Sequence, residues 1–226
     1  MSFPFSKLLY GVSRELLQVL APSECPGCGA LGRPLCDRCA SVPRVARDEI
    51  LHGIRVLSAS SYEGPLSLAI RAFKYQERTE LASPLARWLW PLLDCLDEKA
   101  VLTPVPMHAE RLAERGYNQA ALLAGALGRG CGRSVDYRLL ERVRQTKQQA
   151  GLGAQERRVN VEGSFAVRKA RSGERCFGWL GSQPSTSVIL IDDVVTTGST
   201  FGGCVRVLHQ AGYRVVACLA LARALH

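Results

Sequence analysis

The segment from residue 188 to residue 200 constrains the fold most strongly. Residues 188–191 are four consecutive apolar residues, which is typical of a buried parallel strand. Asp192 and Asp193 follow, and a turn rich in hydroxyl groups at 196–200 opens the next segment. Ligands bind at the carboxyl ends of parallel strands, and backbone N–H groups at a helix start favour phosphate. Because carboxylates repel phosphate, we expect the two aspartates to contact sugar hydroxyls or hydrated Mg²⁺, and the turn to hold a phosphate. A strand–turn–helix without a ligand is the alternative.

The apolar patterns elsewhere predict an α/β fold. We expect a parallel sheet with helices on both faces in a domain spanning residues 51–226. Strands are expected at 54–62, 101–106, 135–140, 188–191 and 213–221, and helices at 65–74, 83–96, 118–127 and from the 196–200 turn to a stop at Gly212.

Two Cys-x-x-Cys pairs near the N-terminus predict a metal site. Cys25 and Cys28 form the first pair, and Cys36 and Cys39 form the second. Together they supply the four thiolates of a closed, structural Zn²⁺ site, and redox-active dithiols are the alternative. The other five cysteines are expected to pack as small apolar residues: Cys95, Cys131, Cys176, Cys204 and Cys218.

Residues 1–50 are expected to form a separate N-terminal module. An amphipathic helix within residues 1–24 leads into the cysteine pairs, and a boundary follows near residue 50. The chain has neither a secretory signal nor an apolar run long enough for a membrane span. The odd number of cysteines, nine, also favours a reducing compartment. We therefore expect a cytoplasmic protein.

The positive charge is concentrated in the middle of the chain. The net charge is +9, and residues 108–160 contain ten basic and five acidic residues. Only five of the 29 basic residues are lysines, which favours bidentate phosphate contacts by arginine, although a GC-rich genome gives the same bias. Arg111 and Arg115 lie four residues apart and share one helical face. They are candidates for a pyrophosphate clamp, and a solvated helix surface is the alternative.

The 188–200 segment resembles the 5-phosphoribosyl-1-pyrophosphate (PRPP) motif of type I phosphoribosyltransferases. Three further segments and the cysteine pairs extend the resemblance to the ComF/GntX family over nearly the whole chain: 104–119, 145–149 and 156–165. Members of this family are linked to natural transformation, in which single-stranded DNA enters the cytoplasm. The resemblance implies a type I phosphoribosyltransferase-like parallel sheet preceded by a small zinc ribbon.

The resemblance also implies roles for individual residues. Asp192 and Asp193 would be the catalytic carboxylates and would bind the ribose hydroxyls of PRPP, with Mg²⁺ on the diphosphate. The remaining PRPP contacts would come from Val194, Thr196, Thr197, Gly198, Ser199, Thr200, Arg111 and Arg115. The candidates for a lid or a DNA-binding surface are Lys74, Gln149, Arg157, Arg158 and Asn160.

Three functions are compatible with these residues. The first is a DNA-uptake protein that binds PRPP and single-stranded DNA. The second is an active phosphoribosyltransferase that transfers ribose 5-phosphate to a nitrogen nucleophile, although the sequence identifies no acceptor site. The third is an assembly factor whose zinc module and first helix dock a competence helicase, which would bring the protein to the inner face of the membrane.

Overall fold

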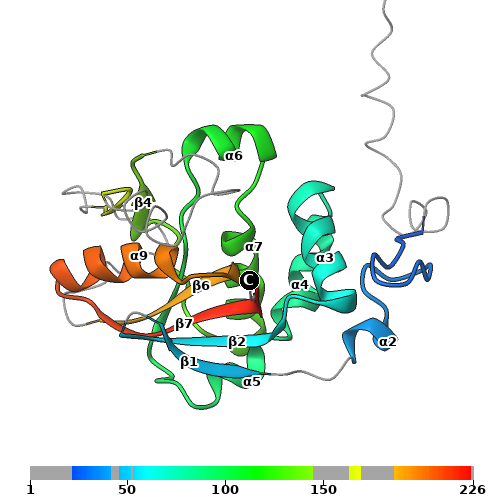
Figure 1. The fold of residues 1–226 in the computed structure, drawn as a ribbon, viewed down its shortest axis with the longest axis horizontal. Coiled ribbons are helices and arrows are strands. Elements are labelled where there is room, and N and C mark those ends of the chain that lie inside the picture. Colours follow the sequence, from blue (N-terminus) through cyan, green and yellow to red (C-terminus); the bar gives the residue numbers. More distant parts are fainter. Residues whose placement is uncertain (1–21, 42–45, 52, 145–162, 169–185, 225–226) are drawn as a thin grey trace, which may run out of the picture.

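A mainly parallel five-stranded sheet forms the centre of the protein (Figure 1). The computed structural model describes residues 22–41, 46–51, 53–144, 163–168 and 186–224. The strand order is β1-β2-β7-β6-β3, and only β1 is antiparallel to its neighbour. The strands are β1 (Arg47–Leu51), β2 (Ile54–Ser61), β3 (Val101–Pro104), β6 (Ser187–Val195) and β7 (Arg214–Arg223).

Alternate residues of β6 enter two different hydrophobic cores. Ile189 and Ile191 belong to the core that contains residues of α3, α4 and α7. Val188 and Leu190 belong to the core that contains residues of α9 and the β4–β5 hairpin. The period-two alternation of a strand therefore explains why both faces are covered, and the predicted fold class is confirmed. The covering elements are α3 (Gly64–Tyr75), α4 (Ala82–Ala86), α7 (Gln119–Cys131), β4 (Leu140–Arg142), β5 (Phe165–Val167) and α9 (Ser199–Gln210).

Two predicted elements differ from the structure. The helix expected at 83–96 is divided into α4 and α5 (Trp90–Leu93) after a 3-10 turn (η2, Thr79–Leu81), and Pro91 lies in the first turn of α5. Proline has no N–H to donate, so it starts a helix better than it continues one. The strand expected at 135–140 is reduced to a single bridge at Val135.

A side-chain turn explains the shortened strand. The carboxylate of Asp136 accepts hydrogen bonds from the backbone N–H groups of Arg138 and Leu139, both at 2.9 Å. Such a turn satisfies the backbone locally and competes with sheet pairing. The chain then enters the short hairpin strand β4 instead of the central sheet.

The edge strand β1 was not predicted. Three of its five residues are charged, and only Ile50 and Leu51 are apolar. It is stabilised by pairing with β2 from Arg47–Ser58 to Leu51–Ile54. The strand spans the boundary that the sequence places near residue 50.

Candidate functional site

The two aspartates lie at the carboxyl end of β6 and receive a counter-charge from α3. The ammonium Nζ of Lys74, in the last turn of α3, lies 2.9 Å from Oδ1 of Asp193, which is 6% exposed. The backbone N–H of Asp193 donates to Oδ1 of Asp192 at 2.9 Å. The structure therefore brings Lys74, assigned from the sequence to a lid or DNA surface, to the carboxylate pair.

The pair is electrostatically asymmetric. Burial, together with the charge of Asp193, raises the pKa of Asp192 to about 7, although Lys74, the backbone N–H of Asp193 and Arg142 oppose the rise. Burial disfavours the charged form of Lys74, but the charge and hydrogen bond of Asp193 outweigh it and raise the pKa of the ammonium. Near neutral pH, Asp192 can therefore gain or lose a proton beside the Asp193–Lys74 ion pair.

The turn after β6 presents hydroxyl groups at the start of α9. Gly198 is the N-cap of α9 and has a φ of 76°, a left-handed conformation that favours glycine. The side-chain oxygens of Thr197 and Ser199 lie 2.8 Å apart, and the backbone N–H of Ser199 donates to Oγ1 of Thr197. A Cβ atom at Gly198 would lie 3.2 Å from Cβ of Leu51, so β1 packs against this turn.

The other predicted residues of this segment lie around the same turn. Thr196 and Thr200 are half-buried, and Val194 packs against the core that contains α3. Hydroxyl groups, a helix N-terminus and a carboxylate pair thus follow one another along the chain. This arrangement offers hydrogen-bond donors to an anion and acceptors to hydroxyl groups.

Arg111 and Arg115, which the sequence suggests as a pyrophosphate clamp, lie on α6 (Ala109–Arg115). No residue of this helix is buried. The guanidinium of Arg115 lies 5.2 Å from the centre of the Tyr75 ring, and its Nη1 donates to Oε1 of Gln119 at 3.0 Å. Arg115 is therefore held beside the residue that follows Lys74. Neither contact distinguishes a pyrophosphate clamp from a solvated helix surface.

Arg142, which the sequence analysis did not single out, is affected by the charge of Arg111 and itself affects Asp192. Burial lowers the pKa of Arg142, and the charge of Arg111 lowers it further. Arg142 in turn opposes the rise in the pKa of Asp192. Nothing in the local sequence marks Arg142, because its position depends on how β4 packs. Four predicted residues lie outside the described residues: Gln149, Arg157, Arg158 and Asn160.

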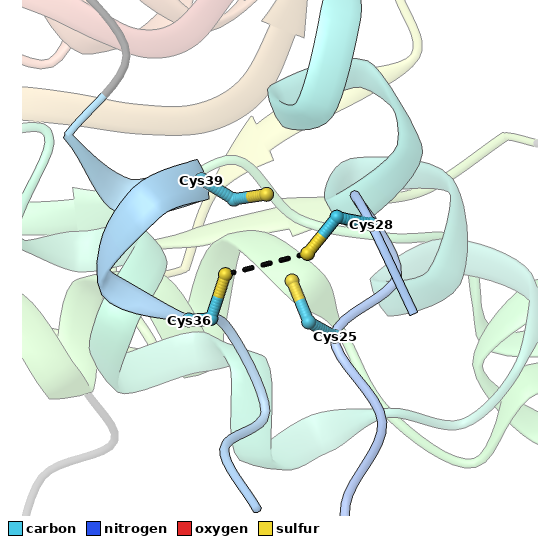
Figure 2. Close-up of side chains that lie close together, drawn as sticks. All are labelled: Cys25, Cys28, Cys36 and Cys39. Carbon is cyan, nitrogen blue, oxygen red and sulfur yellow. Dashed lines mark hydrogen bonds between the residues drawn. The ribbon is translucent and has the colours of Figure 1, made fainter. Parts of the chain in front are cut away.

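The four clustered cysteines converge on one point (Figure 2). The sulfur atoms of Cys25, Cys28, Cys36 and Cys39 all lie within 4.8 Å of one another, and those of Cys28 and Cys36 are 3.5 Å apart. Tetrahedral Zn–S bonds of about 2.3 Å place sulfur atoms about 3.8 Å apart, so the cluster could bind a zinc ion. A backbone hydrogen bond from Ala30 and a side-chain one from Arg38 lower the pKa of Cys28 to about 6, which favours the thiolate ligand.

The cysteine module packs along α3. Cys25 and Cys39 belong to the same hydrophobic core as Phe73. At the start of α3, Gly27 lies so close to Pro65 that an added Cβ would come within 2.9 Å of it. Beyond the other end of α3, Nη2 of Arg78 donates to the carbonyl oxygen of Glu24 at 2.9 Å. One helix therefore contacts both the cysteine module and, through Lys74, the carboxylate pair.

The remaining cysteines only partly follow expectation. Cys204 and Cys218 are buried, and burial raises the pKa of both thiols. Cys95 and Cys131 are exposed, and Cys176 lies outside the described residues. The first helix expected within residues 1–24 also falls almost entirely outside them.

The fold defines an α/β protein with a carboxylate pair at a strand end and a cluster of four cysteines. No protein-family model matches the chain. It is 33% identical over 171 residues to competence protein F of Haemophilus influenzae, covering 72% of this chain and 70% of that protein. It is 31% identical over 214 residues to the DNA utilization protein YhgH of Salmonella typhi, covering 90% and 85%. The chain belongs to the ComF/GntX family.

Among solved structures, the chain is similar to an orotate phosphoribosyltransferase from Aeropyrum pernix. The identity is 18% and the TM-score is 0.34, with 80% of this chain and 75% of that one covered. Among the described residues, no helix is both long and apolar enough to cross a membrane.

Proposed function

We propose that this chain is a ComF-type protein of natural transformation or DNA uptake that binds PRPP and single-stranded DNA. One observation supports the ligand most directly: the Asp192–Asp193 pair, with Lys74 on Asp193, is followed at once by the hydroxyl-rich turn. The names of the relatives, which refer to competence and to DNA utilization, support the process.

The chemistry of PRPP fits this order of groups. Asp192 and Asp193 would accept hydrogen bonds from the ribose hydroxyls, and the 196–200 turn would donate to the 5′-phosphate. Arg111 and Arg115 would contact the diphosphate, which Mg²⁺ would also neutralise. In this proposal the two ends of the ligand are held by different elements, α6 and the start of α9.

Fragments of PRPP test this division of the pocket. We expect Thr197→Val to weaken the binding of ribose 5-phosphate and of PRPP while leaving the binding of pyrophosphate unchanged. Arg111→Gln should have the opposite selectivity, weakening pyrophosphate and PRPP alone. Calorimetry with the three ligands and Mg²⁺ measures both effects. If both variants lose all three ligands equally, or neither loses any, the division is wrong.

Transfer to an acceptor is the second candidate, because it uses the same pocket. The C1–oxygen bond to pyrophosphate would break, a C1–nitrogen bond would form, and the nucleophile's proton would pass to solvent. Both carboxylates would stabilise the positive charge that develops on the ribose ring. Release of pyrophosphate in the presence of candidate bases tests this role, and release that persists in Asp193→Asn would contradict it.

A docking role for the cysteine module remains a third proposal. Leu31 in this module is an apolar residue that is 69% exposed, so it is accessible to a partner. Leu31→Ser should then weaken binding to a competence helicase without reducing the zinc content. Unchanged binding would contradict this role.

A further inference from the structure

We propose that Tyr75 is the stacking platform for a base of single-stranded nucleic acid and that Arg115 contacts the adjoining phosphate. This inference rests on the proposed function, because it places the single strand beside the residues proposed to bind PRPP. It assigns one aromatic residue and one cation to the strand, and it implies that the strand and PRPP share Arg115.

The exposure of Tyr75 is the first observation. The side chain is 70% exposed, the largest exposed fraction of any aromatic residue in the part of the chain that the structure describes. It lies at the last position of α3, directly after Lys74, whose ammonium contacts Asp193. The ring is therefore attached to a helix that is fixed at the carboxylate pair.

The fixed position of Arg115 is the second observation. Its guanidinium lies 5.2 Å from the centre of the Tyr75 ring and donates to Oε1 of Gln119. Gln119 is only 2% exposed, so the acceptor belongs to the core. One side of the Tyr75 ring is thus covered by a cation whose direction is set by a buried amide.

This pair matches the chemistry of a single strand. A base can stack on the uncovered part of the Tyr75 ring, and the neighbouring phosphate can pair with the guanidinium of Arg115. Stacking on an aromatic ring does not depend on the identity of the base, whereas the arginine contact is electrostatic and depends on salt. The two residues therefore make contributions that can be measured separately.

A second consequence is that the single strand and PRPP should compete for Arg115. Arg115 is also a candidate contact for the diphosphate of PRPP, and one guanidinium cannot fully serve two anions. We therefore expect PRPP with Mg²⁺ to weaken binding of the strand in a concentration-dependent manner. Asp193, which is proposed to bind the ribose of PRPP, should not be needed for binding of the single-stranded nucleic acid.

The test compares two strands of equal length on the zinc-loaded full chain, an oligothymidylate and its abasic analogue. We expect Tyr75→Ala to weaken binding of the oligothymidylate about tenfold and to leave binding of the abasic strand unchanged. Tyr75→Phe should retain affinity, and Tyr137→Ala is the matched control, since Tyr137 is also exposed, at 53%. Arg115→Gln should weaken both strands and reduce the salt slope by about 0.7. Fluorescence anisotropy measures all four variants.

The possible failures are distinguishable. Equal losses on both strands in Tyr75→Ala, no loss on either, or an equal effect of Tyr137→Ala would overturn the stacking role. Strand binding that is unaffected by saturating PRPP would overturn the sharing of Arg115. If the wild-type chain binds neither strand, the inference fails together with the DNA part of the proposed function. PRPP binding, measured on the same preparation, reports separately on the ligand pocket.

Discussion

The ammonium of Lys74 lies 2.9 Å from Oδ1 of Asp193 and joins the end of α3 to the end of β6. This ion pair lets two consecutive carboxyl groups stand side by side at the strand end, because the cation offsets part of their repulsion. It also connects the site to α3, the helix along which the cysteine module packs. Helix α3 therefore contacts both the carboxylate pair and the cysteine cluster.

Breaking this ion pair should cost stability. We expect Lys74→Met to lower the free energy of unfolding by about 2 kcal/mol, because it leaves a buried carboxylate without its partner. Asp193→Asn in the same chain should recover part of the loss, with a coupling energy of about 1–2 kcal/mol in urea denaturation. The exposed pair Arg33–Asp37 is the control, and Arg33→Ala should cost about 0.5 kcal/mol or less. Equal costs for both lysine and arginine variants would contradict the role of Lys74.

Loss of zinc should loosen α3. The cysteine module contacts α3 through Pro65 at one end and supports Arg78 beyond the other. Cys28→Ser should therefore lower the zinc content, accelerate hydrogen exchange in residues 64–75, and weaken PRPP. Cys131→Ser is the matched control, because this exposed cysteine lies outside the cluster. Unchanged exchange in 64–75 after zinc loss would contradict the link.

Two glycines, Gly198 in the turn before α9 and Gly202 within α9, test the role of that turn. Gly198→Ala should cost about 2 kcal/mol and weaken PRPP, because the left-handed φ is unfavourable for alanine and its Cβ would meet Leu51 at 3.2 Å. Gly202→Ala should instead stabilise the protein by up to about 1 kcal/mol, because it lies in the helix and its nearest neighbour is 3.9 Å away. Chemical denaturation of both variants measures the contrast. Similar effects at the two positions would contradict it.

The raised pKa of Asp192 predicts a dependence on pH. Asp192 ionises near pH 4 in the unfolded chain and near pH 7 in the folded protein. Between these values the unfolded chain binds fewer protons, so the stability that this residue contributes falls as the pH rises from 4 to 7. Relative to wild type, the free energy of unfolding of Asp192→Asn should therefore increase by about 2–3 kcal/mol when the pH is raised from 5 to 8. Urea denaturation at both values tests this, and an unchanged difference would contradict it.

The same titration should act on the ligand in the opposite direction. A protonated Asp192 accepts fewer hydrogen bonds from hydroxyl groups, so we expect affinity for ribose 5-phosphate to rise with pH until about pH 7. Asp192→Asn should bind more weakly and should lack the part of the pH dependence that belongs to this group. Calorimetry over this range measures both. A profile identical in wild type and variant would assign the titration to the ligand instead.

Local patterns in the sequence predicted the strand end well. The apolar run at 188–191 fixes a buried strand, and the turn after it can only lie at the start of the next helix. The partners of this segment depend on tertiary packing, which no local pattern encodes: Lys74 comes from α3, and Arg142 from the short hairpin. The apolar spacing of 83–96 likewise overestimated a helix that Pro91 interrupts.

Calorimetry with PRPP and Mg²⁺ on wild type and Asp193→Asn tests the central proposal most directly. The zinc-loaded wild-type chain should bind about one PRPP, and Asp193→Asn should bind it at least about tenfold more weakly, because one hydrogen bond to a charged acceptor contributes about 1.5–3 kcal/mol. Both proteins should retain their zinc and their binding of the oligothymidylate. Equal PRPP affinity in the two proteins, or no PRPP binding by wild type, would contradict the assignment of this strand end as the PRPP site.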